Sequence, residues 1–287
     1  MRTMTGSPPT AADQVDLSNW RTAPYCRWAF NHVREIVPSA PILRDRSHCR
    51  RLREAPAGLL DVVFTDAKGE QLDAAAWVAR DAIDALTVLR DDALLLEWYA
   101  TGQAPQLPHI LMSVSLSVLG LLTGAVLDQA GVSADTQLVQ VLPELKGSAW
   151  QGATIRDALD MRVSIQFDED YLATDGAIVA YRKAQGWNPL AAGESTSDLR
   201  SFLPTLAQAD GGHGGPFHYV SPNTDLLAWA LERISGQRYS ELLSERLWQP
   251  IGAEEDGYIT VDRLGAARAA GGVCVTARAV ARRGVFL

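Results

Sequence analysis

The chain has 287 residues, of which 47% are hydrophobic and 21% charged, and this balance is typical of a globular protein with a sizeable buried core. Its formal net charge of −8 and isoelectric point of about 5.1 argue against nucleic-acid and anionic-membrane partners, since both select basic surfaces. The three cysteines, Cys26, Cys49 and Cys274, are odd in number and widely spaced, which argues against a disulfide framework and a cysteine metal motif.

The sequence also bears on localisation. Residues 1–16 are polar, and no apolar core follows a charged start as a signal peptide requires, so we expect a cytoplasmic protein. Residues 110–127 carry no charge and approach the roughly 20 residues of a membrane span. Because this run contains serines and glycines and has no flanking basic residues, it predicts a buried core helix instead.

The first predicted elements are two helices and a hairpin. Apolar residues at helical spacing predict helices over residues 24–37 and 72–83. Residues 85–90 and 93–99 flank a tight Asp91-Asp92 turn, as the strands of a β-hairpin do. The hairpin leads into a long apolar helix that starts at Ser113 and ends near Gly131.

The second half of the chain is predicted to be mainly helical, with one long irregular segment. Residues 163–192 have mixed polarity and no clean period, which is typical of a functional loop; they are predicted to form a mobile lid. The other predicted elements are helices over residues 154–160, 196–203, 224–234 and 239–248, a strand over 270–275, and a last helix capped by Thr276.

Ser113 is the first candidate for chemistry. At a helix start, unpaired N–H groups and the helix dipole favour developing negative charge. The position three residues on shares its face of the helix, and in a Ser-x-x-Lys nucleophile motif a lysine there takes the serine proton. Leu116 occupies that position and cannot take a proton. Taken alone, Ser113 is therefore also compatible with a plain helix N-cap.

Four stretches carry a resemblance to a known family: LMSVSLSVLG (111–120), VLPELKGSAWQGATIRDALDMRVSIQFDEDY (141–171), FHYVSPNTDLLAWALERISG (217–236) and AAGGVCVTARAVAR (269–282). Together they resemble the serine β-lactamase and penicillin-binding-protein family. Within it, the chain is most similar to the 6-aminohexanoate-dimer hydrolases, or nylon-oligomer hydrolases, and related esterases.

The resemblance implies an α/β (α+β) fold, with a mixed sheet flanked by helices plus an all-helical lobe, and no metal or organic cofactor. We accordingly expect an N-terminal extension over residues 1–70 and a sheet-containing part over 71–110 and 255–287. A mostly helical lobe over 111–254 would carry the site. The chain ends where relatives continue, so the C-terminal strands of that sheet are expected to be missing, which would leave the hairpin with an unpaired edge.

The same resemblance implies the site residues. Ser113 matches the acylated nucleophile, and Tyr219 matches the tyrosine that carries protons to and from the leaving group. Ser221 falls where many relatives have the asparagine of a Tyr-x-Asn motif and the nylon-oligomer hydrolases have serine.

Three further residues in the predicted lid are implied to bind substrate. Tyr171 and Trp187 resemble loop residues that close over an amide substrate, and Asp175 is a weaker candidate for contacting its amine. A packed aromatic or a solvated carboxylate is the equally weighted alternative for each of them.

These matches predict a serine hydrolase of small-molecule amides or esters, impaired because Leu116 replaces the family lysine and because the C-terminal part is absent. The alternative is a catalytically dead protein that binds small amides, or a non-functional truncated fragment. We expect no nucleic acid or membrane as a partner, and a homodimer is left open.

Overall fold

The computed structural model describes residues 3–286; Met1, Arg2 and Leu287 lie outside the described residues. Its helices are α1 (Cys26–Ala29), α2 (Ala74–Arg80), α3 (Val114–Ala130), α4 (Leu138–Val141), α5 (Ile155–Leu159), α6 (Gly176–Ala184), α7 (Leu199–Phe202), α8 (Ser221–Ser235), α9 (Tyr239–Leu243) and α10 (Ala277–Phe286). Its strands are β1 (Ser39–Ile42), β2 (Arg53–Glu54), β3 (Val63–Thr65), β4 (Gln71–Asp73), β5 (Ala85–Arg90), β6 (Ala93–Tyr99), β7 (His109–Ile110), β8 (Gly257–Thr260) and β9 (Val273–Val275).

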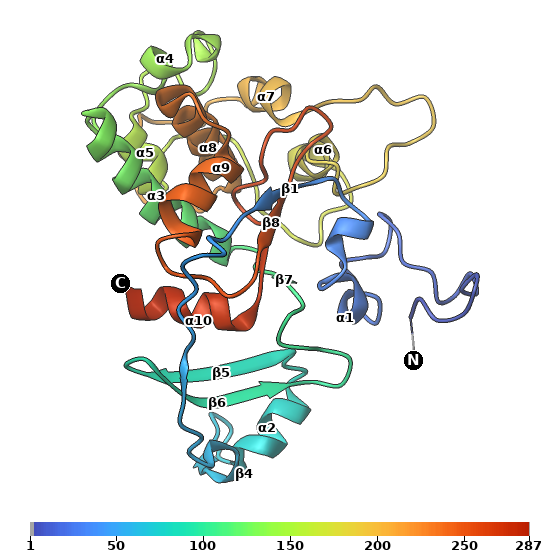
Figure 1. Cartoon of the computed structure of the whole chain (residues 1–287). Coiled ribbons are helices and arrows are strands. Elements are labelled where there is room, and N and C mark those ends of the chain that lie inside the picture. Colours follow the sequence, from blue (N-terminus) through green and yellow to red (C-terminus); the bar gives the residue numbers. More distant parts are fainter. Residues whose placement is uncertain (1–2, 287) are drawn as a thin grey trace.

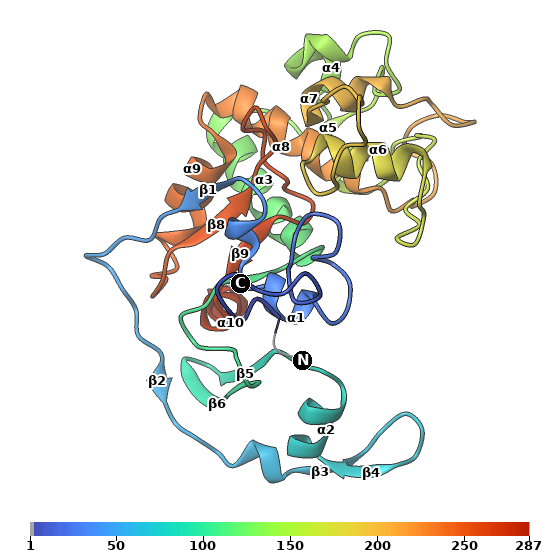
Figure 2. The same ribbon diagram turned by 90° about the vertical axis from the view of Figure 1, so that its right-hand side faces the viewer.

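The strands of the described residues form separate sheets. One has the order β1-β8-β9-β7, one the order β2-β6-β5, and β3 pairs with β4. Strand β5 therefore lies at an edge of its sheet. In Figure 1 the β5–β6 hairpin and α2 lie below α10, and the helices α3 to α9 lie above it. Figure 2 shows the segment that carries β2 as an extended strap, which joins β1 to the lower part of the molecule.

The helical lobe is built around α3 and α8. Leu122 of α3 and Leu226 of α8 are almost completely buried in one large apolar core, to which the helices α4 to α9 also contribute. Helix α3 ends at Gly131 and α8 at Gly236, and both glycines take the positive φ that a left-handed C-terminal cap requires.

Several predicted elements are confirmed. The hairpin has the predicted strands, and Asp91 in its turn has the positive φ that a tight hairpin turn requires. The start of α3 at Ser113 and the last helix after Thr276 are also as predicted. The architecture is the mixed α/β arrangement with a helical lobe that the sequence led us to expect.

Three predictions of secondary structure were wrong. The predicted helix over 24–37 is broken after α1, where Ile110 N–H donates to the carbonyl of Phe30 at 2.9 Å. The predicted helix over 72–83 begins as strand β4, and Asp73 then caps α2 by accepting from Ala76 N–H at 2.6 Å. The segment 163–192, expected to be irregular, contains α6.

The N-terminal segment is anchored to the rest of the chain. Trp20 is fully buried in a second apolar cluster that also contains Trp187, Tyr258 and Cys274. Its indole N–H donates to the carbonyl of Trp187 at 3.1 Å. Among the described residues, no helix combines the length and the apolar character that crossing a membrane would require.

Candidate active site around Ser113

Ser113 occupies the N-cap position of α3, and the backbone there is unusual. Met112 has a φ of +46°, which is a strained conformation for a residue with a side chain. Ser113 itself has helical dihedral angles instead of the extended ones of an ordinary cap, and its side chain makes no capping hydrogen bond. The hydroxyl of Ser113 is therefore not used by the helix, and the residue is exposed.

The start of α3 is held in place by β9. Leu111 N–H donates to the carbonyl of Val273 at 2.8 Å. Val273 N–H donates to the buried hydroxyl of Ser115 at 3.3 Å. These two contacts fix the turn that presents Ser113, and they join segments more than 150 positions apart (158 for the second pair).

Three hydroxyl groups meet beside this turn. The Tyr171 hydroxyl interacts with the side chains of both Ser113 and Tyr219. Tyr171 comes from the loop before α6 and Tyr219 from the segment that enters α8. The Tyr219 oxygen is buried, and it has no well-aligned hydrogen bond among the described residues. The structure thus brings together three of the residues expected at the site.

The electrostatics of this cluster keep Tyr171 protonated. Burial, followed by the negative charge of Glu169 and the neighbouring Tyr219, raises the pKa of Tyr171 above its ordinary value. The hydrogen bond from Ser113 acts in the opposite direction, because a donor to the phenol oxygen stabilises the phenolate. The protonated Tyr171 hydroxyl therefore lies close to the side chains of both Ser113 and Tyr219.

Leu116 lies one turn along α3 from Ser113 and is half-buried. Its backbone N–H donates to the carbonyl of Ser113 at 3.0 Å, which places it on the same helical face. An alkyl side chain at this position brings neither a base nor a positive charge to the serine.

Ser221 is buried at the first position of α8, and both of its donors are engaged by one carboxylate. Its N–H donates to Oε2 of Glu169 at 2.8 Å, and its hydroxyl donates to Oε1 of the same residue. Asp175 is exposed at the N-cap of α6 and makes no side-chain capping bond. No described contact brings Asp175 to the three hydroxyls.

Trp187 is a packed aromatic residue, which was one of the two alternatives for it. Its ring is 4% exposed and meets Trp20 edge-to-face, with 5.1 Å between ring centroids. Its indole N–H donates to the hydroxyl of Thr260 at 3.2 Å. These contacts already occupy the ring and its N–H. The expected role of Trp187 in closing over a substrate remains a prediction.

Sequence reasoning missed a buried ion pair between Asp225 of α8 and Arg268. Arg268 donates to Asp225 Oδ2 at 2.9 Å and to the Tyr181 hydroxyl at 2.8 Å, and Ala270 N–H donates to Asp225 Oδ1 at 2.9 Å. The Arg268 guanidinium also lies 4.8 Å from the Tyr181 ring centroid. This cluster joins α8 to the loop before β9. Since Tyr181, Asp225 and Arg268 lie at least 43 positions apart, no local sequence pattern signals the cluster.

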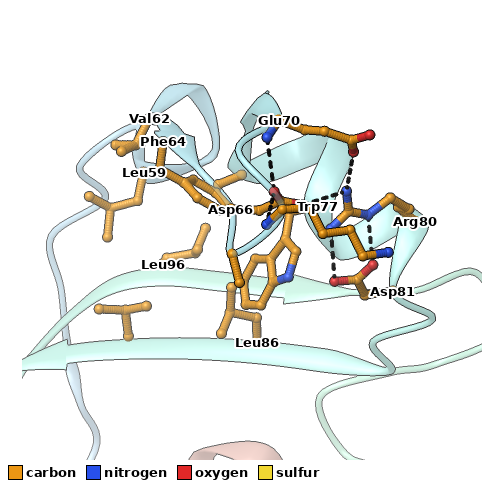
Figure 3. Close-up of a pocket in the computed structure, with 14 residues that line it drawn as sticks. Leu59, Val62, Phe64, Asp66, Glu70, Trp77, Arg80, Asp81, Leu86 and Leu96 are labelled. Atoms are coloured by element: carbon orange, nitrogen blue, oxygen red, sulfur yellow. Dashed lines mark hydrogen bonds and ion pairs between the residues drawn. The ribbon is translucent and has the colours of Figure 1, made fainter.

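A cavity of about 920 Å³ lies elsewhere, between α2, the β3–β4 pair and the face of the β5–β6 hairpin. Figure 3 shows Trp77 and Leu86 among its apolar lining, and Arg80 at its side. Arg80 is already paired with Asp66, Glu70 and Asp81. None of the expected site residues lines this cavity.

The described residues contain no group of three or more His, Cys, Asp or Glu side chains placed to hold a metal ion. The groups that the structure places beside Ser113 are the hydroxyls of Tyr171 and Tyr219, and the carboxylate of Glu169 lies two residues before Tyr171 in the same loop.

Comparison with known proteins identifies a matching family model and a similar hydrolase. The beta-lactamase family model matches residues 79–285. A 6-aminohexanoate-dimer hydrolase of Paenarthrobacter ureafaciens is 38% identical over 278 residues, which cover 96% of this chain and 68% of that protein.

Solved structures agree with this at the level of the fold. A Bacillus anthracis protein assigned as a 6-aminohexanoate-dimer hydrolase superposes with a TM-score of 0.88 at 24% identity, over 97% of this chain and 72% of its own. A D-alanine carboxypeptidase AmpC from Burkholderia cenocepacia gives a TM-score of 0.52 at 18% identity, over 72% and 60% of the two chains. The expected fold class is thereby confirmed. From the family match and the 38% identity together, the chain belongs to the beta-lactamase family and is related to the 6-aminohexanoate-dimer hydrolases.

Proposed function

We propose that the chain is a serine hydrolase of small amides or esters that forms an acyl-enzyme on Ser113 and uses Tyr219 as its proton carrier. The observation that carries this proposal is the meeting of the Ser113, Tyr171 and Tyr219 hydroxyls at the start of α3. The relationship to an enzyme named for hydrolysing an amide dimer supports the substrate class.

In the first half of the reaction, Ser113 Oγ bonds to the carbonyl carbon and gives its proton to the Tyr171 oxygen, while Tyr171 gives its own proton to Tyr219. Tyr219 in turn gives its own proton to the leaving nitrogen or oxygen as the bond from the carbonyl carbon to that atom breaks, so both tyrosines end as neutral phenols. In the second half, water adds to the acyl carbon, the Ser113 ester bond breaks, and Ser113 regains its proton. The geometry supports this order because a proton carrier must lie within hydrogen-bonding reach of the nucleophile.

We expect the reaction to be slow in this chain. With Leu116 in place of the family lysine, the groups beside Ser113 are phenols, and the raised pKa of Tyr171 disfavours the phenolate that could act as a base. Removing one member of a nucleophile and base unit can cost on the order of a millionfold in rate. Leu116 also supports the second candidate, a protein that still binds small amides without turning them over.

Other features of the chain remain predictions. These are the cytoplasmic location, the homodimer, the domain boundaries at residues 70, 110 and 254, the mobility of the predicted lid over 163–192, and the substrate contacts of Asp175 and Trp187. The same holds for the alternative of a non-functional truncated fragment.

The test compares covalent labelling by a fluorophosphonate and hydrolysis of a p-nitrophenyl ester in five forms: the parent chain, Leu116→Lys, Ser113→Ala, Tyr219→Phe and Ser117→Ala. We expect a negligible rate for the parent and a small gain for Leu116→Lys, because lysine restores a base beside the serine. Combined with Leu116→Lys, both Ser113→Ala and Tyr219→Phe should abolish that gain. Ser117→Ala, an exposed serine on the same helix, should not.

Two results would contradict the proposal in different ways. Labelling that persists in Ser113→Ala would exclude Ser113 as the nucleophile. Rapid hydrolysis by the parent chain that is lost in Ser113→Ala would keep the nucleophile but refute the expected impairment, and it would make Tyr219 the first suspect for the activating base.

A further inference from the structure

The loop before α6 is attached to the start of α8 through one side chain, Glu169. Both carboxylate oxygens of Glu169 accept from Ser221, one from its N–H at 2.8 Å and the other from its hydroxyl. The two residues are 52 positions apart. Helix α8 has 15 residues, and its N-cap Val220 supplies no side-chain bond, so Glu169 serves as its cap. The positive end of the helix dipole stabilises a carboxylate at this place.

This attachment lies directly beside the three hydroxyls. Glu169 precedes Tyr171 by two residues, and Tyr219 precedes Ser221 by two residues. Val220 between the latter pair is extended, so Tyr219 and Ser221 project to the same side of the chain. The Glu169–Ser221 contact and the Tyr171–Tyr219 contact therefore join the same two segments at adjacent points.

The rest of the loop is also held. The backbone carbonyl of Tyr171 accepts from Arg182 of α6 at 3.1 Å, and Leu172 N–H donates to Asp170 Oδ1 at 2.9 Å. These contacts fix the backbone of the loop. Neither reaches α8, whereas Glu169 does. Tyr171 as a whole is 62% exposed, so packing alone does not hold its side chain beside Ser113.

We infer that Glu169 is a positioning residue of the proposed site: by binding Ser221 it fixes the loop that carries Tyr171 and holds the Tyr171 hydroxyl between Ser113 and Tyr219. This inference rests on the proposed function for its consequence in catalysis, although the attachment itself does not depend on activity.

The charge of Glu169 also raises the pKa of Tyr171, which a neutral residue would not do. After burial, this carboxylate is the main cause of the raised pKa of Tyr171. Arg182, whose own pKa burial lowers, and Asp170 are the other charged groups near Tyr171. Glutamine at position 169 has the shape to keep both contacts with Ser221, because its amide can accept from the N–H and donate to the hydroxyl. Glutamine thus separates the attachment from the charge.

The experiment uses the full chain with ¹³Cζ-labelled tyrosine, in the parent, Glu169→Gln, Glu169→Ala and Asp168→Asn forms. Asp168 is the matched control, since it is an exposed carboxylate in the same loop. The Tyr171 resonance is assigned with Tyr171→Phe and followed as pH rises. The rate of fluorophosphonate labelling is measured for the same four forms in the Leu116→Lys background.

In Glu169→Gln we expect Tyr171 to titrate at lower pH than in the parent, because a negative charge that disfavours the phenolate is gone. In Glu169→Ala we expect the Tyr171 resonance to move to the position of a free tyrosine and labelling to slow by about tenfold, as for a misplaced catalytic group. Asp168→Asn should leave both the resonance and the rate unchanged.

The inference is overturned if Glu169→Ala, folded by circular dichroism, keeps the parental Tyr171 resonance and titration. It is equally overturned if Asp168→Asn changes them as much as Glu169→Ala does. Absence of labelling in every form would contradict the proposed hydrolase function. The tyrosine resonance tests the attachment of the loop independently of any activity.

Discussion

Replacing Asp225 by asparagine tests the buried ion pair behind the site. The Asp225 and Arg268 side chains are 0% and 8% exposed, and the carboxylate accepts from Arg268, from the Tyr181 hydroxyl and from Ala270 N–H. Asparagine keeps the shape but leaves the Arg268 guanidinium buried without a counter-charge. Arg268 Nε has no hydrogen-bond partner among the described residues, and the groups left to attract the cation are the more distant Glu169 and the Tyr181 and Trp187 rings.

The expected cost follows from the loss of the directly bonded counter-charge. Removing one partner of a buried pair costs about 3–5 kcal/mol, which for a chain of this size lowers Tm by roughly 10 °C. The replacement of Arg268 by methionine should cost a similar amount, because it leaves the buried Asp225 carboxylate without a counter-charge. The double variant should cost much less than the sum of the two, since neither charge is then left alone.

Urea unfolding followed by circular dichroism measures these free energies. The matched control is Arg233→Met, which removes an exposed pair with Glu144 (43% and 47% exposed) and should cost less than about 1 kcal/mol. If Asp225→Asn costs no more than this control, or if the three variants are simply additive, the pair does not hold α8 to the loop before β9 as argued.

Three further outcomes are expected. The Arg278 guanidinium holds the pKa of Glu97 below its ordinary value in the folded chain. Glu97 therefore stabilises the fold at pH values above its pKa in the unfolded chain, and this stability is lost as pH falls through its pKa in the folded chain. Glu97→Gln should accordingly reduce the loss of unfolding free energy that acid causes. In the native protein Cys49 is exposed and should react at once with a thiol reagent, whereas burial raises the pKa of Cys274 and should delay its reaction until urea unfolds the chain. Thr154→Ala removes the cap of α5 and should cost about 1 kcal/mol in the same urea assay, and an unchanged midpoint would contradict the capping role.

The sequence alone determined the elements whose signals are local. The turn at Asp91 sets the hairpin because this residue must adopt a positive φ that few residue types allow, and the strands on either side then pair, with a register shift between Val88 and Leu89. The start of α3 at Ser113 and the ends of α3 and α8 at glycines are likewise decided within a few residues. The family motifs named Ser113, Tyr171 and Tyr219 as site residues, and the structure gathers these three into one cluster.

The tertiary structure decided where side chains from distant segments meet. Glu169 and Ser221 are 52 positions apart, and the contact between Trp187 and Trp20 spans 167 positions, so neither leaves a periodic signal. Helix α6 has buried residues at Ile178, Tyr181 and Ala184, but this short stripe begins after a glycine and is too weak to stand out from its irregular surroundings. Local patterns fix backbone conformation because they act over one or two turns. The burial of Trp187 and the placement of Tyr171 beside Ser113 depend on which surfaces pack together, and only the folded chain determines that.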